Sequence, residues 1–129
     1  LIRSVMEGAT FAMTDAMRLI EARGVNIGQV RLSGGGARGA FWRQLQADIY
    51  GKTCVTINSE EGGALGVALL AAVADGEYRD IRQATKAAIE VTRTIKPAAA
   101  AKRRYAKLHE QYDRFYPALK KEFARLAQL

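Results

Sequence analysis

The sequence predicts a helix-rich α/β domain whose core runs α-β-α-β-α, with extra helices at its C-terminal end. Two short segments rich in β-branched residues, at 29–33 and 53–57, each lie between stretches with helical periodicity. A glycine run, residues 34–36, follows the first segment, at the point where a strand would turn into a helix. From residue 98 onward, apolar side chains recur every three or four positions, as in a long amphipathic helix.

The first helix is expected over residues 3–23. Val5, Phe11 and Leu19 fall on one face of such a helix, together with other mostly apolar residues at the same spacing. Gly24 follows directly and suits the left-handed conformation in which many helices end.

A second helix is expected over about 37–50, ended by Gly51, and a third over about 59–74. Asn58 and Glu61 have the spacing of a capping box at the start of the third helix. That helix is rich in glycine, which costs helix propensity. We interpret its small residues as allowing the helix to pack closely on the sheet.

The rest of the chain is expected to be helical. Residues 80–91 have a helical pattern, residues 92–97 form a connector, and the long tail is interrupted or restarted at Pro117. We predict no third strand downstream. The two strands are therefore expected to pair in parallel through a right-handed crossover, and further strands must come from elsewhere because two do not make a stable sheet.

The composition fits one globular domain. The chain has 129 residues, 49% of them apolar, and a formal net charge of +7. No apolar run approaches the roughly 20 residues that span a bilayer, so we expect no membrane partner and a cytoplasmic location. The sequence opens within a predicted helix and without Met, which we interpret as a piece of a longer protein.

The single cysteine, Cys54, and the single histidine, His109, are far apart in the sequence. Cys54 lies in a predicted strand, where a buried thiol acts as a small apolar side chain. These two residues are too few to bind a metal ion, and no base adjoins the thiol to activate it. We therefore predict no metal ligand and no catalytic residue.

Residues 98–129 carry a net charge of +5, from eight basic and three acidic side chains. A basic helix can bind nucleic acid or an acidic membrane, but the aromatic residues here follow the spacing of a packed face. We therefore interpret the charge as a solvated helix face or as a surface that complements an acidic partner, and we expect no nucleic-acid partner. A stand-alone binding or self-associating module, such as a homodimer, is an alternative from another functional class.

The segment Leu32–Gly39 (LSGGGARG) is the strongest functional signal in the chain. Glycine accepts positive φ and lets a ligand approach the backbone. The helix start that follows offers free N–H groups and a partial positive charge to a phosphate. A nucleotide-binding turn fits this pattern, and a tight turn without a ligand is the structural alternative.

Two other enzyme classes share parts of this pattern. Gly34, Gly36 and Gly39 have the spacing of a dinucleotide fingerprint, with Glu60 near the position of its acidic residue, but further βα units are missing. The same run resembles the oxyanion-hole loop of patatin-like phospholipases. Those enzymes need a nucleophilic serine in the pattern G-x-S-x-G, which this chain does not contain.

A pattern over nearly the whole chain resembles the FGGY carbohydrate kinases, and most closely their xylulokinase branch. The matching segments are Met6–Phe11 (MEGATF), Arg31–Arg38 (RLSGGGAR), Trp42–Gln44 (WRQ), Ala47–Asp48, Gly51, Glu60–Ala72 (EEGGALGVALLAA), Tyr105, Tyr112 and Tyr116–Lys120 (YPALK).

This resemblance implies the actin-like, ribonuclease H-like fold, with residues 1–129 as the C-terminal portion of the second kinase domain. The sugar-binding and catalytic N-terminal domain would be absent. Trp42 is expected in the core, with stacking on adenine as the alternative, and Gln44 anchors the helix or faces solvent. Asp48 is structural or lies at the surface, and Glu7 is a buried structural acid or lies near nucleotide or metal. The implied nucleotide-binding residues are Gly35, Gly36, Ala37, Arg38 and Ala40.

The resemblance also implies an activity. The full-length enzyme would use ATP with Mg²⁺ to phosphorylate a pentulose, with D-xylulose converted to D-xylulose 5-phosphate. The family's catalytic aspartate would precede Leu1. Because phosphoryl transfer needs groups on both sides of a cleft, this chain alone is expected to be inactive.

Overall fold

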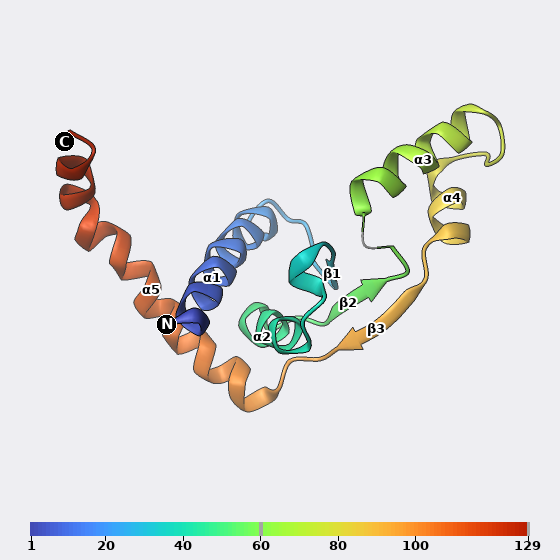
Figure 1. The fold of residues 1–129 in the computed structure, drawn as a ribbon. Helices are drawn as coiled ribbons and strands as arrows, with labels where there is room; N and C mark the ends of the chain where they lie inside the picture. Colours follow the sequence, from blue (N-terminus) through green and yellow to red (C-terminus); the bar gives the residue numbers. More distant parts are fainter. Residues whose placement is uncertain (60, 129) are drawn as a thin grey trace.

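The computed structural model describes residues 1–59 and 61–128, and it is an α/β structure rich in helices (Figure 1). Residue 60, at the predicted start of the third helix and in the dinucleotide pattern, lies outside the described residues. The elements are α1 (Ile2–Glu21), β1 (Val30–Leu32), a 3₁₀ turn η1 (Gly35–Ala37), α2 (Ala40–Tyr50), β2 (Cys54–Ile57), α3 (Gly62–Ala74), α4 (Ile81–Ala88), β3 (Val91–Ile95) and α5 (Ala99–Leu126).

The sheet has three strands in the order β1-β2-β3. β1 and β2 pair in parallel, as predicted, and β3 pairs antiparallel with β2. The prediction of no third strand was therefore wrong, as were the helix to residue 91 and the connector over 92–97. Four of the five β3 residues are exposed, so the strand lacks the buried alternate positions that reveal a strand in a sequence.

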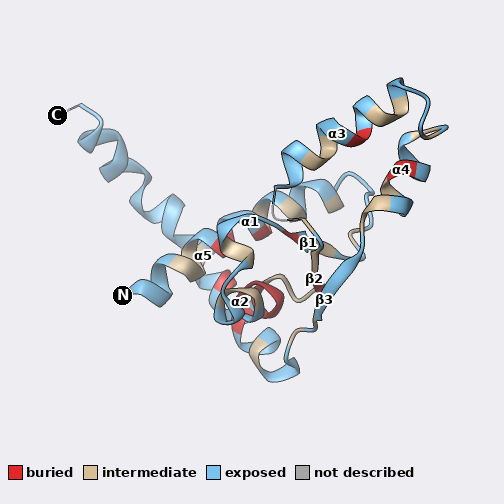
Figure 2. Ribbon diagram, turned by 45° about the vertical axis from the view of Figure 1, so that its right-hand side comes forward, coloured by how far each residue is buried: buried red, intermediate tan, exposed pale blue. Residues whose placement is uncertain are grey.

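The core lies around α2, which packs against α1, α5 and the sheet (Figure 2). Towards α1 and α5, Leu45 and Ile49 pack with Phe11 and Tyr105. Towards the sheet, Ala47 packs with two strand residues. All of these side chains are buried, and they hold together segments that are distant in the sequence.

The predicted helix ends after α1 and α2 are confirmed. Gly24 and Gly51 adopt positive φ, at 86° and 63°. A Cβ on Gly51 would also lie 2.8 Å from Lys102 Cε of α5. Glycine at position 51 thus serves both the backbone turn and the close passage of α5.

α3 and α4 form an arm that projects from the rest of the chain (Figure 1). Asn58 does not cap α3, because its side chain donates to the Ala88 carbonyl at 2.9 Å and accepts from Glu90 N–H at 3.1 Å. The N-cap of α3 is Glu61, whose side chain makes no capping bond. α3 packs on α4 instead of lying against the sheet as predicted, and only Leu69 of α3 is buried.

α5 is one continuous helix with Pro117 inside it, so the predicted interruption was wrong. Asp48 fixes the start of α5, because its Oδ1 accepts from Ala98 N–H at 2.8 Å and from Gln44 Nε2 at 2.9 Å. Asp48 is therefore structural, and Gln44 anchors the helix. Within the described residues, no helix combines the length and apolar character that crossing a membrane requires.

Candidate functional site

The glycine turn lies between β1 and α2, as the sequence predicted. Gly34 has φ 70° and ψ −164°, which a residue with a side chain adopts only under strain. Hydrogen bonds from Ala37 N–H to Gly34 O and from Arg38 N–H to Gly35 O then close a 3₁₀ turn. Gly39 is extended, so α2 begins later than predicted.

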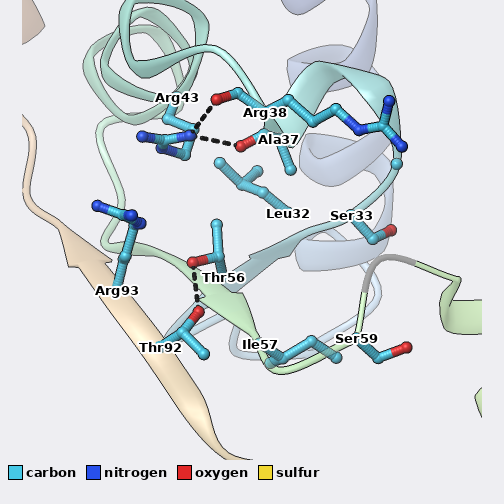
Figure 3. A pocket seen from close by; sticks show the side chains of 11 residues that line it. Leu32, Ser33, Ala37, Arg38, Arg43, Thr56, Ile57, Ser59, Thr92 and Arg93 are labelled. Atoms are coloured by element: carbon cyan, nitrogen blue, oxygen red, sulfur yellow. Dashed lines mark hydrogen bonds between the residues drawn. The ribbon is translucent and has the colours of Figure 1, made fainter.

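A pocket of about 260 Å³ lies between this turn and the sheet (Figure 3). It adjoins the carboxyl ends of the parallel strands β1 and β2, which is where open α/β sheets bind their ligands. Its volume falls short of the roughly 300–1,000 Å³ of a complete small-molecule site. It is lined by Leu32, Ser33, Gly34, Ala37, Arg38, Arg43, Thr56, Ile57, Ser59, Thr92 and Arg93.

The structure brings only some of the predicted site residues to this pocket. Ala37 and Arg38 line it, whereas Gly35, Gly36 and Ala40 do not. A Cβ built on Gly36 would lie 3.6 Å from the side-chain nitrogen of Gln46 and 3.8 Å from the Trp42 ring, on α2. A side chain at position 36 would therefore meet α2 at ordinary van der Waals distance.

Trp42 is partly buried and packs against the cluster around Leu45, so the expectation of a core role is confirmed. Its indole nitrogen is buried and has no hydrogen-bond partner among the described residues. The ring lines a different hollow from the one beneath the glycine turn.

Arg43 holds the C-terminal side of the turn. Its Nη1 donates to the carbonyl oxygens of Ala37 and Arg38, at 2.6 Å each. The guanidinium thus ties two carbonyl groups to α2 and brings a positive charge to the pocket. Arg43 lies in the WRQ segment, but no role for it was predicted, because its contacts depend on how the turn folds against the helix.

The opposite wall comes from β2 and β3. Thr56 Oγ1 and Thr92 Oγ1 lie 2.8 Å apart, and Arg93 follows on the same strand (Figure 3). Sequence reasoning missed this wall because it predicted no strand there. The β-branched composition of Val91–Ile95, and not an alternation, is the signal that could have indicated a strand there.

Glu7 lies away from the pocket and joins α1 to α5. It accepts from Arg3 Nε at 2.9 Å and from Tyr105 Oη at 2.7 Å, and its side chain is 22% exposed. Burial acts to raise the pKa of Glu7, but the hydrogen bonds from Tyr105 and Arg3 outweigh it and hold that pKa below its usual value. These contacts favour the structural interpretation of Glu7.

The single histidine and the single cysteine are both buried. His109 Nε2 lies 2.7 Å from Asp15 Oδ1 and 3.4 Å from Asp113 Oδ1, a grouping that could hold a metal ion and that sequence reasoning missed. Arg18 already brings a cation to both carboxylates. Burial raises the pKa of the Cys54 thiol to about 11, so the thiol stays protonated and inert.

The model of the C-terminal domain of the FGGY family of carbohydrate kinases matches residues 1–74. The chain belongs to the FGGY family of carbohydrate kinases. It is 33% identical over 124 residues to the xylulose kinase of Staphylococcus epidermidis and 30% identical over 115 residues to that of Bacillus subtilis. These matches cover 96% and 89% of this chain, and 24% and 23% of the two relatives. The chain thus spans about a quarter of the length of these FGGY kinases.

Solved FGGY kinase structures share the fold. A ligand-bound xylulose kinase from Lactobacillus acidophilus matches with a TM-score of 0.88 and 25% identity, over 96% of this chain and 25% of that one. A xylulose kinase from Rhodospirillum rubrum matches with a TM-score of 0.80 and 23% identity, over 95% and 25%. The three-stranded sheet and its helices are therefore an FGGY C-terminal fold.

Proposed function

We propose that residues 1–129 form the C-terminal portion of the second domain of an ATP-dependent sugar kinase and carry the nucleotide side of its cleft. The observation that supports this most directly is the pocket at the carboxyl ends of β1 and β2, bounded by the glycine turn and lined by three arginines. Backbone N–H groups in a turn and arginine side chains are both suited to phosphate. The nucleotide would be ATP or ADP.

We further propose that the parent enzyme phosphorylates a pentulose, with D-xylulose as the substrate. The support is that several relatives, from different bacteria, are xylulose kinases. An L-xylulose/3-keto-L-gulonate kinase of Escherichia coli is also similar, at 28% identity over 128 residues. This similarity supports a sugar of this general class as the substrate, and it does not favour D-xylulose in particular.

The proposal places Mg²⁺ on the nucleotide. Of the described residues, those that line the pocket include no carboxylate, and Mg²⁺ is commonly held by substrate phosphates together with few protein groups. Because the pocket holds only part of a nucleotide and the catalytic groups are proposed to lie in the parent's other domain, the chain alone should not transfer phosphate.

Calorimetry with ADP tests the nucleotide site. Gly34→Ala should weaken ADP binding, because a Cβ at positive φ strains the turn. Gly76→Ala is the matched control: it has φ +86°, also has open space around a built Cβ, and lies in the arm away from the pocket. Equal affinity in the two variants and the unchanged chain would exclude the turn as the site. With ATP, Mg²⁺ and D-xylulose, turnover above background would contradict the expected inactivity.

A further inference from the structure

We propose that Arg93 binds a phosphate group of the nucleotide, across the pocket from the glycine turn. This inference rests on the proposed function and assigns a role to a residue of β3, the strand that the sequence did not reveal. Two arginines of the pocket then have different roles: Arg43 supports the turn, and Arg93 contacts the ligand.

The pairing of the strands places Arg93 on the correct face. Leu32 of β1 is opposite Thr56 of β2, and Thr56 is opposite Arg93 of β3. Side chains that are directly opposite across paired strands lie on the same face of a sheet. This face also carries Leu32, which lines the pocket beneath the glycine turn together with Thr56 and Arg93.

A β-bulge adjoins this position. Thr56 is opposite Arg93 but Ile57 is opposite Val91, so Thr92 is the extra residue on β3. Thr92 hydrogen-bonds Thr56 through the two hydroxyl groups, which fixes the bulge. Bulges redirect side chains and are frequent beside functional sites. The bulge therefore places Thr92 and the adjacent Arg93 at the same pocket wall.

The two arginines on opposite walls differ in what they contact. Arg43 Nη1 is engaged by two carbonyl oxygens. The Arg93 side chain makes no hydrogen bond or ion pair with any residue that the structure describes, and it extends from β3 towards the Arg43 end of the pocket (Figure 3). A guanidinium group offers a planar pair of donors that matches phosphate oxygens.

The charge around Arg93 also favours an anion. The lining residues that the structure describes include Arg43 and Arg93 on facing walls but no acidic side chain. Like charges around one hollow repel one another, and a bound phosphate relieves that repulsion. The Thr56 and Thr92 hydroxyl groups on the same wall hydrogen-bond each other, which leaves one neutral O–H to donate to a ligand.

The test compares ADP with adenosine, which has the same base and sugar but no phosphate. Arg93→Gln removes the charge from an exposed site. Arg31→Gln is the matched control, because Arg31 is an exposed strand arginine opposite Val55 and therefore on the other face of the sheet. Binding to the 129-residue chain is measured by calorimetry or by the fluorescence of Trp42, its only tryptophan. Circular dichroism checks that each variant is folded.

Arg93→Gln should weaken ADP binding about tenfold, the scale of one charge-assisted hydrogen bond, and leave adenosine binding unchanged. Arg31→Gln should change neither. If ADP binds the unchanged chain and Arg93→Gln equally well, or if both variants lose affinity alike, the role of Arg93 is overturned while the nucleotide site stands. An equal loss for adenosine would overturn the phosphate contact. If the unchanged chain binds neither ligand, the proposed function fails together with the inference.

Discussion

Two helices of this chain, α2 and α3, show that composition and burial need not agree. α2 carries an arginine, two glutamines and an aspartate, yet five consecutive residues, Leu45–Ile49, are buried. α3 has no polar or charged side chain, yet only Leu69 is buried, while Val67 and Leu70 are 68% and 59% exposed. The burial of these helices depends on the elements that pack against them and not on their apolar content.

The surroundings differ in a simple way. α2 is enclosed by α1, α5 and the sheet, whereas α3 packs against α4. A helix that is apolar on all sides belongs to the interior of a larger structure. The exposed surface of α3 thus accords with the proposal that this chain is part of a longer kinase, and the arm should be the less stable region of the isolated chain.

Truncating one leucine in each helix should give the largest contrast. Leu45→Ala opens a cavity beside Phe11 and Tyr105 and should lower the free energy of unfolding by about 2–5 kcal/mol. Leu70→Ala on α3 should change it by less than about 0.5 kcal/mol, because the side chain is already largely in solvent. Urea denaturation followed by circular dichroism measures both, and similar losses would contradict the contrast.

Thiol reactivity should separate the two regions next. Cys54 of β2 is fully buried and has a pKa of about 11, whereas an exposed cysteine has one near 8.5. At pH 8, Cys54 should therefore react with a disulfide reagent about a hundredfold more slowly than a cysteine placed on α3 by Val67→Cys. The measurement uses Val67→Cys in a Cys54→Ala background. Equal rates would mean that β2 opens as readily as the arm.

The smallest effect concerns the acid stability of the α1–α5 contact. The pKa of Glu7 is lower in the folded chain than in the unfolded one, where it is about 4.5. The ionised Glu7 therefore stabilises the fold at pH values above 4.5, and this stabilisation is lost as the pH falls through the lowered pKa. Glu7→Gln should flatten the decline of stability below about pH 4.5. Glu77→Gln, at an exposed position in the arm, is the control. An unchanged decline in Glu7→Gln would show that the carboxylate does not drive it.

The fold could be predicted from the sequence where local signals and tertiary structure agree. The helices α1 and α2, the parallel strands and the turn that joins them follow from periodicity and from the glycines at 24, 34 and 51. At Asn58 the local spacing predicted a helix cap, but the side chain bonds to residues 88 and 90 instead. Contacts across such a distance in the chain cannot be inferred from a pattern four residues long.

The candidate site was predictable only on one side. The glycine turn was found from its residues, and the family resemblance assigned Ala37 and Arg38, which line the pocket. Arg43 and Arg93 were missed for different reasons. The Arg43 side chain bonds to carbonyl groups of the preceding turn, a contact that depends on the fold of that turn. The position of Arg93 at the pocket depends on the antiparallel pairing of β3 with β2, more than 30 residues away along the chain.

The bonds of Asn58 have a consequence for how this protein can vary. Its side chain and its backbone N–H form hydrogen bonds with residues 88 and 90, so the segments that enter and leave the α3–α4 arm are bonded to each other beside the sheet. Closing a longer loop costs only slightly more entropy than closing a short one. Insertions and deletions at the end of the arm that is distant from the sheet should therefore be tolerated during evolution without shifting the register of β3 or displacing the pocket wall.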